Sequence, residues 1–233
     1  MLVLAWLIFC QACSNPPERR LSLKPDTGQA NLVIWDFEGA DLMGLDNVDY
    51  LSRVLPEMLL ANLSGHPEIR LLERINLIDA LEELKLGSSE VADESHRLKI
   101  GRIVGANRMT FGHYIVSGKE IRIDLRVVDT ETSLTLFSDH KQGQLDQIEK
   151  SVSELASSIA MKFSSGGPMS KKENLPQTTK REIWKEYEKG LELMDKRDFQ
   201  KALAVFQNLL VLNPGFKPAE KQIGFTIERM ERE

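Results

Sequence analysis

Cysteine is nearly absent from this chain of 233 residues, and its two cysteines, Cys10 and Cys13, both fall within the first thirteen positions. A framework of disulfides is therefore excluded for the body of the protein. A basic region is also lacking, because 30 Lys and Arg stand against 35 Asp and Glu and give a formal net charge of −5. Proteins that bind nucleic acid usually carry a basic footprint, so the composition argues against that class of partner.

Residues that would carry chemistry are equally sparse. The nucleophile elbow of serine hydrolases, the phosphate-binding loop and the dinucleotide fingerprint are all missing. The histidines lie far apart in the sequence, without the spacing of metal ligands; they are His66, His96, His113 and His140. We therefore predict a non-catalytic protein that needs no metal and no other cofactor.

The apolar run at positions 2–9, LVLAWLIF, is too short to span a bilayer but has the length of the hydrophobic region of a signal peptide. Ala12 supplies a small residue directly before Cys13. The stretch resembles the lipobox of bacterial lipoproteins, although Cys10 stands where leucine is usual and no Lys or Arg precedes the run. A buried N-terminal strand is the alternative interpretation.

The lipobox resemblance implies that residues 1–13 are a signal peptide with a lipobox and that Cys13 is lipidated. The protein would then be anchored by lipid in the outer membrane of the bacterial cell envelope and face the periplasm, and Ser14 is compatible with outer-membrane sorting. Residues 14–30 contain three prolines and one glycine among few apolar side chains, so we predict that they form a tether.

Residues 31–163 are predicted to form one α/β domain. Apolar runs and stripes predict strands at 31–37, 69–72 and 134–141 and helices at 48–63 and 145–163. Pro56 should kink the first helix or mark its effective start. Two further helices are expected between these elements, one capped by Asn76 and one capped by Asp93. The buried face of the second should include Ile103, together with Leu98 and Ile100.

The clearest strands flank the tight turn Ser117-Gly118-Lys119. Along the second strand, apolar residues alternate with charged ones: Ile121, Ile123, Leu125 and Val127 against Arg122, Asp124 and Arg126. This period of two predicts an antiparallel sheet with one face toward the core and one toward water. The predicted fold class is therefore α+β or α/β, a mixed sheet with an antiparallel meander and packed helices.

The C-terminal part of the chain has a different character. Residues 164–179 are polar and predicted to be a linker, and residues 180–233 resemble a tetratricopeptide repeat, a small all-α helical hairpin. The signature residues are Gly190, Phe199, Ala202, Phe206 and Pro214, at positions 8, 17, 20, 24 and 32 of the repeat. Because a solenoid normally needs about three repeats for stability, we expect this single repeat to lean on the main domain, on a second copy or on another protein.

The α/β domain also resembles the CsgG family, the curli assembly and transport components of the bacterial envelope. The resemblance rests on the order and spacing of three strings: Leu72-Glu73-Arg74, Gly105-Ala106-Asn107, and Leu125-Arg126-Val127-Val128-Asp129 followed by Thr130 to Thr132. It implies a mixed sheet like that of the small N-terminal domain of TolB. The family resemblance would also imply a ring-shaped pore, because CsgG assembles into an outer-membrane ring whose pore is built from long inserted hairpins. Here the turn at Gly118 and the segment before Leu145 are too short for such insertions.

Three carboxylates cluster where the first strand leads toward its helix: Asp36, Glu38 and Asp41. Ligands of open α/β sheets bind at this end of the strands, so a metal or a basic partner is one interpretation of the cluster. Solvated loop carboxylates are the other.

From these patterns we expect a periplasm-facing lipoprotein that acts as a scaffold or accessory factor in envelope assembly or secretion. Its partners would be other envelope or secretion proteins, met through exposed sheet edges and the concave face of the repeat, and it would also contact the membrane through its lipid anchor. One alternative is a homo-oligomeric outer-membrane secretion channel like CsgG. The third hypothesis is a ligand sensor or enzyme centred on the acidic loop.

Overall fold

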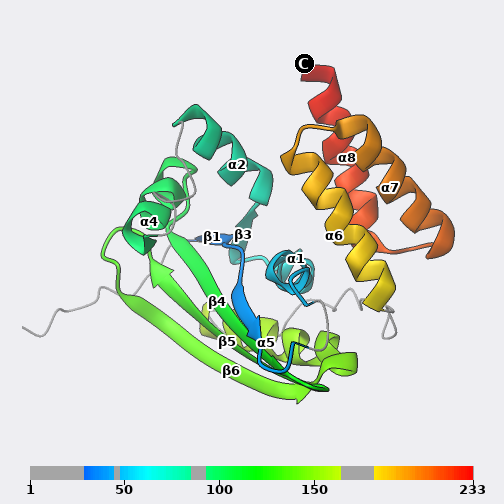
Figure 1. The fold of residues 1–233 in the computed structure, drawn as a ribbon. Helices are drawn as coiled ribbons and strands as arrows, with labels where there is room; N and C mark the ends of the chain where they lie inside the picture. Colours follow the sequence, from blue (N-terminus) through cyan, green and yellow to red (C-terminus); the bar gives the residue numbers. More distant parts are fainter. Residues whose placement is uncertain (1–28, 45–47, 85–92, 164–180, 233) are drawn as a thin grey trace, which may run out of the picture.

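The computed structural model describes residues 29–44, 48–84, 93–163 and 181–232 (Figure 1). The predicted signal peptide with Cys13, nearly all of the tether and the linker at 164–179 lie outside the described residues. We refer to residues 29–163 as the main domain and to the three helices after residue 180 as the C-terminal helices.

The main domain is built on one mixed sheet of six strands. Five of them lie in the order β3-β1-β4-β5-β6, and the sixth, β2, pairs with the C-terminal half of β4. The strands are β1 (Ala30–Ile34), β2 (Glu38–Asp41), β3 (Ile69–Leu72), β4 (Arg108–Ser117), β5 (Glu120–Asp129) and β6 (Thr135–Gln144). Strand β1 runs parallel to both of its neighbours, and β2 runs parallel to β4. Strands β4, β5 and β6 form an antiparallel meander. The predicted fold class, a mixed sheet with a meander and packed helices, is confirmed.

The hairpin between β4 and β5 has the predicted short turn. Ser117 pairs with Glu120, and Gly118 takes a positive φ of 61° that a side chain would strain. The apolar residues that alternate along β5 are buried, whereas Arg122 is exposed and Arg126 half-buried on the opposite face. Strand β6 continues to Gln144, three residues beyond the predicted end, and passes directly into a short 3₁₀ turn at Leu145–Gln147.

Helices cover both faces of the sheet. The helices that do so are α1 (Leu51–Leu63), α2 (Arg74–Glu83), α4 (Glu94–Ile103) and α5 (Ile148–Phe163). They are followed by α6 (Arg181–Asp195), α7 (Phe199–Leu212) and α8 (Lys217–Arg232), of which α6 and α8 contact α1. The apolar side chains of α1 and α5 share one core with the sheet, and those of α2 and α4 form a second core on the opposite face. None of the described helices is long and apolar enough to cross a membrane.

Pro56 lies inside α1 and frees one backbone carbonyl of the helix for a bond outside it. Because proline has no N–H, the carbonyl of Ser52, one turn earlier, lacks its usual helical donor. That carbonyl accepts a hydrogen bond of 2.8 Å from the backbone N–H of Phe37 instead. The proline thereby lets α1 fix the segment that follows β1, where the carboxylate of Asp36 lies.

Two expectations about local structure are wrong and one is confirmed. Helix α2 begins at Arg74, so Asn76 lies within its first turn and is not the cap. Ile103 is 51% exposed, because Gly101 faces the sheet instead and lets α4 approach Met109 closely. Asp93 caps α4 as predicted, since its side chain accepts a hydrogen bond from the N–H of Ser95.

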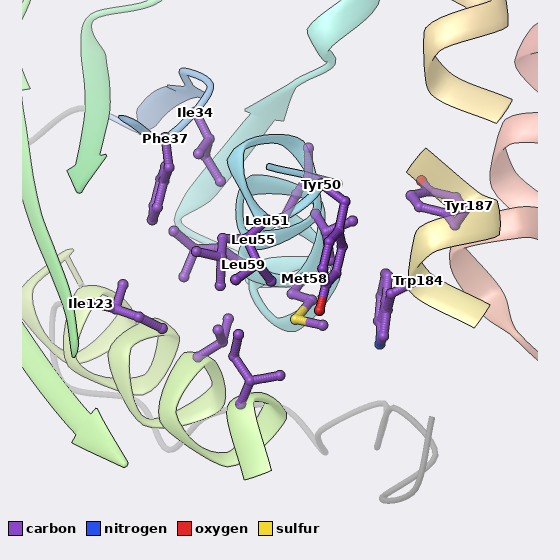
Figure 2. Packing of buried hydrophobic residues seen from close by; sticks show 14 of the residues in the cluster. Ile34, Phe37, Tyr50, Leu51, Leu55, Met58, Leu59, Ile123, Trp184 and Tyr187 are labelled. Atoms are coloured by element: carbon purple, nitrogen blue, oxygen red, sulfur yellow. The ribbon is translucent and has the colours of Figure 1, made fainter. Parts of the chain in front are cut away.

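The C-terminal helices pack against the main domain. Trp184 and Tyr187 project from α6 toward α1 (Figure 2), and both are buried in the same core as α1 and α5. The rings of Trp184 and Phe216 meet edge to face, with centroids 4.9 Å apart. The sequence left three possible supports for the predicted repeat: the main domain, a second copy or another protein. The structure shows contact with the main domain.

Candidate functional site at the carboxyl ends of the parallel strands

The chain leaves two neighbouring parallel strands in opposite directions. After β1 it leads to α1 on one face of the sheet, and after β3 it leads to α2 on the other face. Such a switch point is where open α/β sheets hold their ligands, because the two connections diverge and leave a crevice. Asp36 follows β1 and Arg74 follows β3, so both side chains lie at this crevice.

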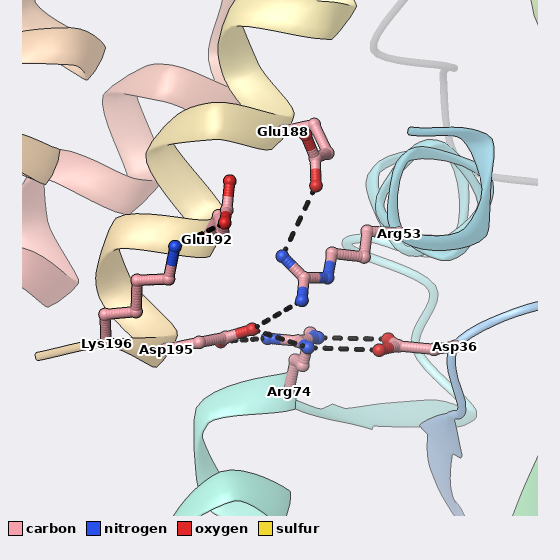
Figure 3. A network of polar contacts seen from close by, with 7 residues as sticks. All are labelled: Asp36, Arg53, Arg74, Glu188, Glu192, Asp195 and Lys196. Carbon is pink, nitrogen blue, oxygen red and sulfur yellow. Dashed lines mark hydrogen bonds and ion pairs between the residues drawn. The ribbon is translucent and has the colours of Figure 1, made fainter. Parts of the chain in front are cut away.

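The guanidinium of Arg74 lies between two carboxylates (Figure 3). Its Nε and Nη2 donate to the two oxygens of Asp36, both at 3.0 Å. Its Nη1 and Nη2 donate to the two oxygens of Asp195, at 2.6 and 3.2 Å. Each contact is the two-pronged geometry that makes arginine–carboxylate pairs strong and directional.

A second guanidinium reaches the same carboxylate. Nη2 of Arg53, on α1, lies 3.1 Å from Oδ2 of Asp195, and its Nη1 donates to Glu188 on α6 at 3.3 Å. We call these five residues, Asp36, Arg53, Arg74, Glu188 and Asp195, the Arg74 network. It sets two cations against three anions and joins the main domain to α6.

Burial and charge act against each other in this network. Burial alone would lower the pKa of Arg74, but the carboxylates of Asp36 and Asp195 outweigh it and raise that pKa above its ordinary value. Arg74 is therefore always a cation. Burial raises the pKa of Glu188 more than the nearby Arg53 lowers it.

Asp195 is an unusual residue for its place in α6. It is the last residue of the helix, where the helix dipole disfavours a negative charge. Its side chain is 22% exposed, so water provides only part of the compensation, and the two arginines provide the rest. The charge of Asp195 is thus explained by the main domain and not by its own helix.

A buried acid lies beside the network. Glu57, on α1, is 5% exposed and accepts a hydrogen bond of 3.1 Å from the hydroxyl of Tyr187. Its pKa is raised from 4.5 to about 7, mainly by burial and also by Glu73, while Arg74 and Lys221 act in the opposite direction. A cavity of about 20 Å³, which is room for about one water, lies among Glu57, Glu73, Arg74 and Asp195.

Helix α8 adds two further ion pairs to the junction. Nζ of Lys221 lies 2.5 Å from the carboxylate of Glu73, and Arg229 donates to Asp79 on α2. The contact between the two parts of the chain is therefore an aromatic core surrounded by charges. The faces of α6 and α8 that carry these residues are covered by the main domain and are not open to a partner in this conformation.

The acidic cluster predicted from the sequence is divided between different partners. Asp36 belongs to the Arg74 network, Glu38 pairs with Arg97 at 2.6 Å, and Asp41 accepts a bond from the N–H of Met43. Glu38 and Asp41 lie on β2 and not in a loop. Within the part of the chain that the structure describes, no group of three or more His, Cys, Asp or Glu side chains could hold a metal ion.

The predicted repeat signature lies in the helical hairpin of α6 and α7. A Cβ on Gly190 would lie 2.4 Å from the ring of Phe206, so the glycine permits the close crossing of the two helices. Ala202 and Phe199 are buried in the same seam, whereas Pro214 is exposed after the end of α7. The packing agrees with the roles expected of these residues, and the assignment as a tetratricopeptide repeat stays a proposal.

A second polar group lies on the face of the meander opposite α1 and α5. The cross-strand register places His113 and His140 on either side of Asp124, beside a hollow of about 310 Å³. Arg122 donates hydrogen bonds of 2.8 and 2.6 Å to the carboxylate of Asp124, and these bonds lower the pKa of Asp124. The linear spacing of the histidines gave no sign of this arrangement, which only the strand register reveals.

Sequence reasoning missed most of the Arg74 network. Arg74 stood in one of the strings that carry the family resemblance, but no role was predicted for it. The signal for Asp195 was an acid at a helix end that disfavours it, and the signal for Glu57 was a carboxylate among the apolar residues of α1.

The backbone is similar to several solved structures of bacterial proteins. The C-terminal domain of LpoB from Escherichia coli is 16% identical and covers 53% of this chain and 89% of its own, with a TM-score of 0.43. Lipoprotein GNA1162 from Neisseria meningitidis is 12% identical and covers 58% of this chain and 99% of its own, with a TM-score of 0.43. TolB from Acinetobacter baumannii is 11% identical and covers 60% of this chain and 29% of its own, with a TM-score of 0.40.

No protein-family model matches the sequence, and no curated protein matches it. The similarity to solved structures concerns the fold, and we take nothing about function from it. Membership of the CsgG family is not shown by these comparisons and stays a proposal.

Proposed function

We propose that this protein is a non-catalytic lipoprotein of the bacterial envelope that faces the periplasm and acts as a scaffold or accessory factor for other envelope or secretion proteins. The proposal rests on what fills the crevice at the switch point, which is the carboxylate of Asp195 from α6. Where an enzyme of this architecture would bind a substrate, this chain places the side chains of its own C-terminal helices. The chemistry of the site is therefore recognition of protein groups by protein groups.

The N-terminal sequence supports the location. An apolar run followed by Ala12 and Cys13 has the features of a lipobox, and acyl chains on Cys13 would hold the protein firmly at a membrane. The segment from 14 to 30 could extend over at most about 60 Å. The main domain could therefore reach partners away from the membrane surface.

The connections of the meander favour a scaffold over the homo-oligomeric channel. Only Gly118 and Lys119 separate β4 from β5, and the 3₁₀ turn at Leu145 begins directly after β6. A membrane-inserted hairpin would need about twenty residues at either position.

Edge pairing with a partner is disfavoured at β6. Asp139 and Lys141 stand opposite Leu125 and Ile123, on the face of the sheet that carries α5. Charged side chains that point inward from an edge strand are a common device against the addition of another strand. We therefore place recognition on the C-terminal helices, where Val211 and Leu212 at the end of α7 are 76% and 69% exposed.

Site-specific photo-crosslinking in intact cells tests the proposal. A photoreactive residue at Val211 should capture a different envelope protein. The same residue at Met161, a position of similar exposure (68%) on α5, serves as the matched control and should capture it poorly. Capture at neither position, or equal capture of many proteins from both, would contradict the adaptor function.

A further inference from the structure

We propose that Arg53 and Arg74 form a carboxylate-binding site that Asp195 fills in this conformation, and that a carboxylate from an acidic segment of a partner protein takes the place of Asp195. The inference rests on the proposed adaptor function, because it names the chemistry by which the partner is recognised. It concerns a site on the main domain that is occupied from within the same chain.

The main domain builds most of this site by itself. Asp36 holds the Nε edge of Arg74 with two bonds of 3.0 Å, and both residues follow strands of the same sheet. The opposite edge of the guanidinium is thereby aimed at the crevice whether or not Asp195 is present. A side chain whose orientation is fixed by its neighbours is prepared to bind a ligand.

The carboxylate that fills the site comes from a distant part of the chain. Asp195 lies 121 residues after Arg74, on a helix that touches the main domain through the aromatic core and the surrounding ion pairs. If α6 withdraws, Arg53 loses both of its partners, Glu188 and Asp195.

The local chemistry makes Asp195 replaceable. Its position at the end of α6 places its charge against the unfavourable end of the helix dipole, which weakens the contact. A carboxylate on an extended segment would not carry this penalty. After opening, Arg53 is left without its two partners and Arg74 keeps only Asp36, so both guanidinium groups have donors for another carboxylate. Glu73 is the competing internal group, because its partner Lys221 would leave with α8.

The geometry selects a carboxylate. The two oxygens of Asp195 accept from Nη1 and Nη2 of Arg74, the fork arrangement that suits a planar carboxylate. Arg53 approaches one of these oxygens from α1.

Chemical rescue in the full chain tests the site itself. The variant Asp195→Ala removes the carboxylate and leaves space between the two arginines. Sodium acetate at about 200 mM should raise the midpoint of thermal unfolding by roughly 2–4 °C relative to sodium chloride at the same concentration. The effect should saturate, and it should vanish in the double variant that also carries Arg74→Gln.

Glu192→Ala provides the matched control. Glu192 lies on the same helix but pairs with Lys196, so acetate should act on this variant no more than chloride does. Asp195→Ser provides a second background that also leaves room for acetate if the alanine variant does not fold. An equal response to acetate and chloride in both Asp195 variants would overturn the proposal.

Competition in the otherwise unmodified chain tests the partner half of the proposal. In a background that carries Trp6→Phe and Trp35→Phe, the emission of the buried Trp184 should shift to longer wavelength when hexaglutamate displaces α6. Hexaglutamine and glutarate should have no such effect at matched ionic strength. A shift with glutarate as large as that with hexaglutamate would mean a small-molecule site and would overturn recognition of a protein segment.

Failure of this inference can be told apart from failure of the adaptor function. A partner that is captured from Val211 with the same yield in the Arg74→Gln variant would refute the carboxylate site and leave the adaptor function standing. No captured partner, together with rescue by acetate, would refute the adaptor function and leave the arginine site as a property of the fold.

Discussion

The hydroxyl of Tyr187 donates a hydrogen bond of 3.1 Å to Oε2 of Glu57, a residue 130 positions earlier in the chain. Both side chains are buried, and they join α6 to α1 at the centre of the junction between the main domain and the C-terminal helices. The bond therefore reports directly on whether the two parts of the chain are in contact.

Tyr187→Phe should destabilise the protein by about 1–3 kcal/mol, because it leaves the buried Glu57 carboxylate without its donor while preserving the aromatic packing. Urea unfolding of the variant at neutral pH gives the measurement. Tyr114→Phe is the matched control, since that hydroxyl donates to the neutral carbonyl of Val48 at 3.2 Å, away from the junction. A smaller loss is expected there, and an equal loss in the two variants would contradict the special role of the Glu57 bond.

The stability of the protein should depend on pH through Glu57. Burial raises the pKa of Glu57 from 4.5 to about 7, so the folded state binds this proton more tightly than the unfolded state does. The contribution is fully present below pH 4.5 and is lost as the pH rises through 7. The difference between the two pKa values corresponds to roughly 3 kcal/mol.

Glu57→Gln removes this contribution, because an amide does not titrate in this pH range. We expect the free energy of unfolding of the unmodified protein to fall by roughly 3 kcal/mol relative to the variant between pH 4.5 and 8. Urea titrations across that range provide the comparison. A constant difference between the two proteins would show that Glu57 ionises at its ordinary pKa.

Arg74→Met should be among the most destabilising polar substitutions in the chain. It leaves the carboxylates of Asp36 and Asp195 without their shared cation, and removing one partner from a largely buried ion pair costs about 3–5 kcal/mol. Lys196→Met is the control, because the exposed pair of Lys196 with Glu192 should contribute less than about 1 kcal/mol. Similar losses in the two variants would mean that the Arg74 network is only a surface feature.

Two helical glycines should respond in opposite directions to alanine. Gly190→Ala would place a Cβ 2.4 Å from the ring of Phe206 and should destabilise the protein by about 1–3 kcal/mol. Gly224→Ala in α8 meets nothing within 4 Å and should stabilise the protein by about 0.5–1 kcal/mol. Thermal unfolding of the pair tests the seam between α6 and α7, and a stabilising Gly190→Ala would contradict the close crossing.

Patterns within short stretches predicted the fold well. The alternation along β5 and the turn at Gly118 define the meander, and the cap at Asp93 defines the start of α4. The failures have local causes. Asn76 has the character of a cap, but the helix begins two residues earlier at Arg74, and Gly101 replaces Ile103 at the contact with the sheet.

The candidate site could be predicted only in part. The end of β1 was a reasonable place to expect a ligand, and Asp36 does bind a basic group there, but that group is Arg74 of the same chain. The meeting of Arg74 with Asp195 depends on how the C-terminal helices pack on α1, and no short-range pattern encodes a contact between residues 121 positions apart. The row of His113, Asp124 and His140 depends in the same way on strand register.

The most direct test of the adaptor function is the size and composition of the complex that this protein forms in its own envelope. Cells are crosslinked, the membranes are extracted with detergent, and the captured complexes are sized and analysed by mass spectrometry. We predict a complex of modest size that contains this chain and a different envelope protein. A large ring that contains only copies of this chain would contradict the proposed function and favour a secretion channel.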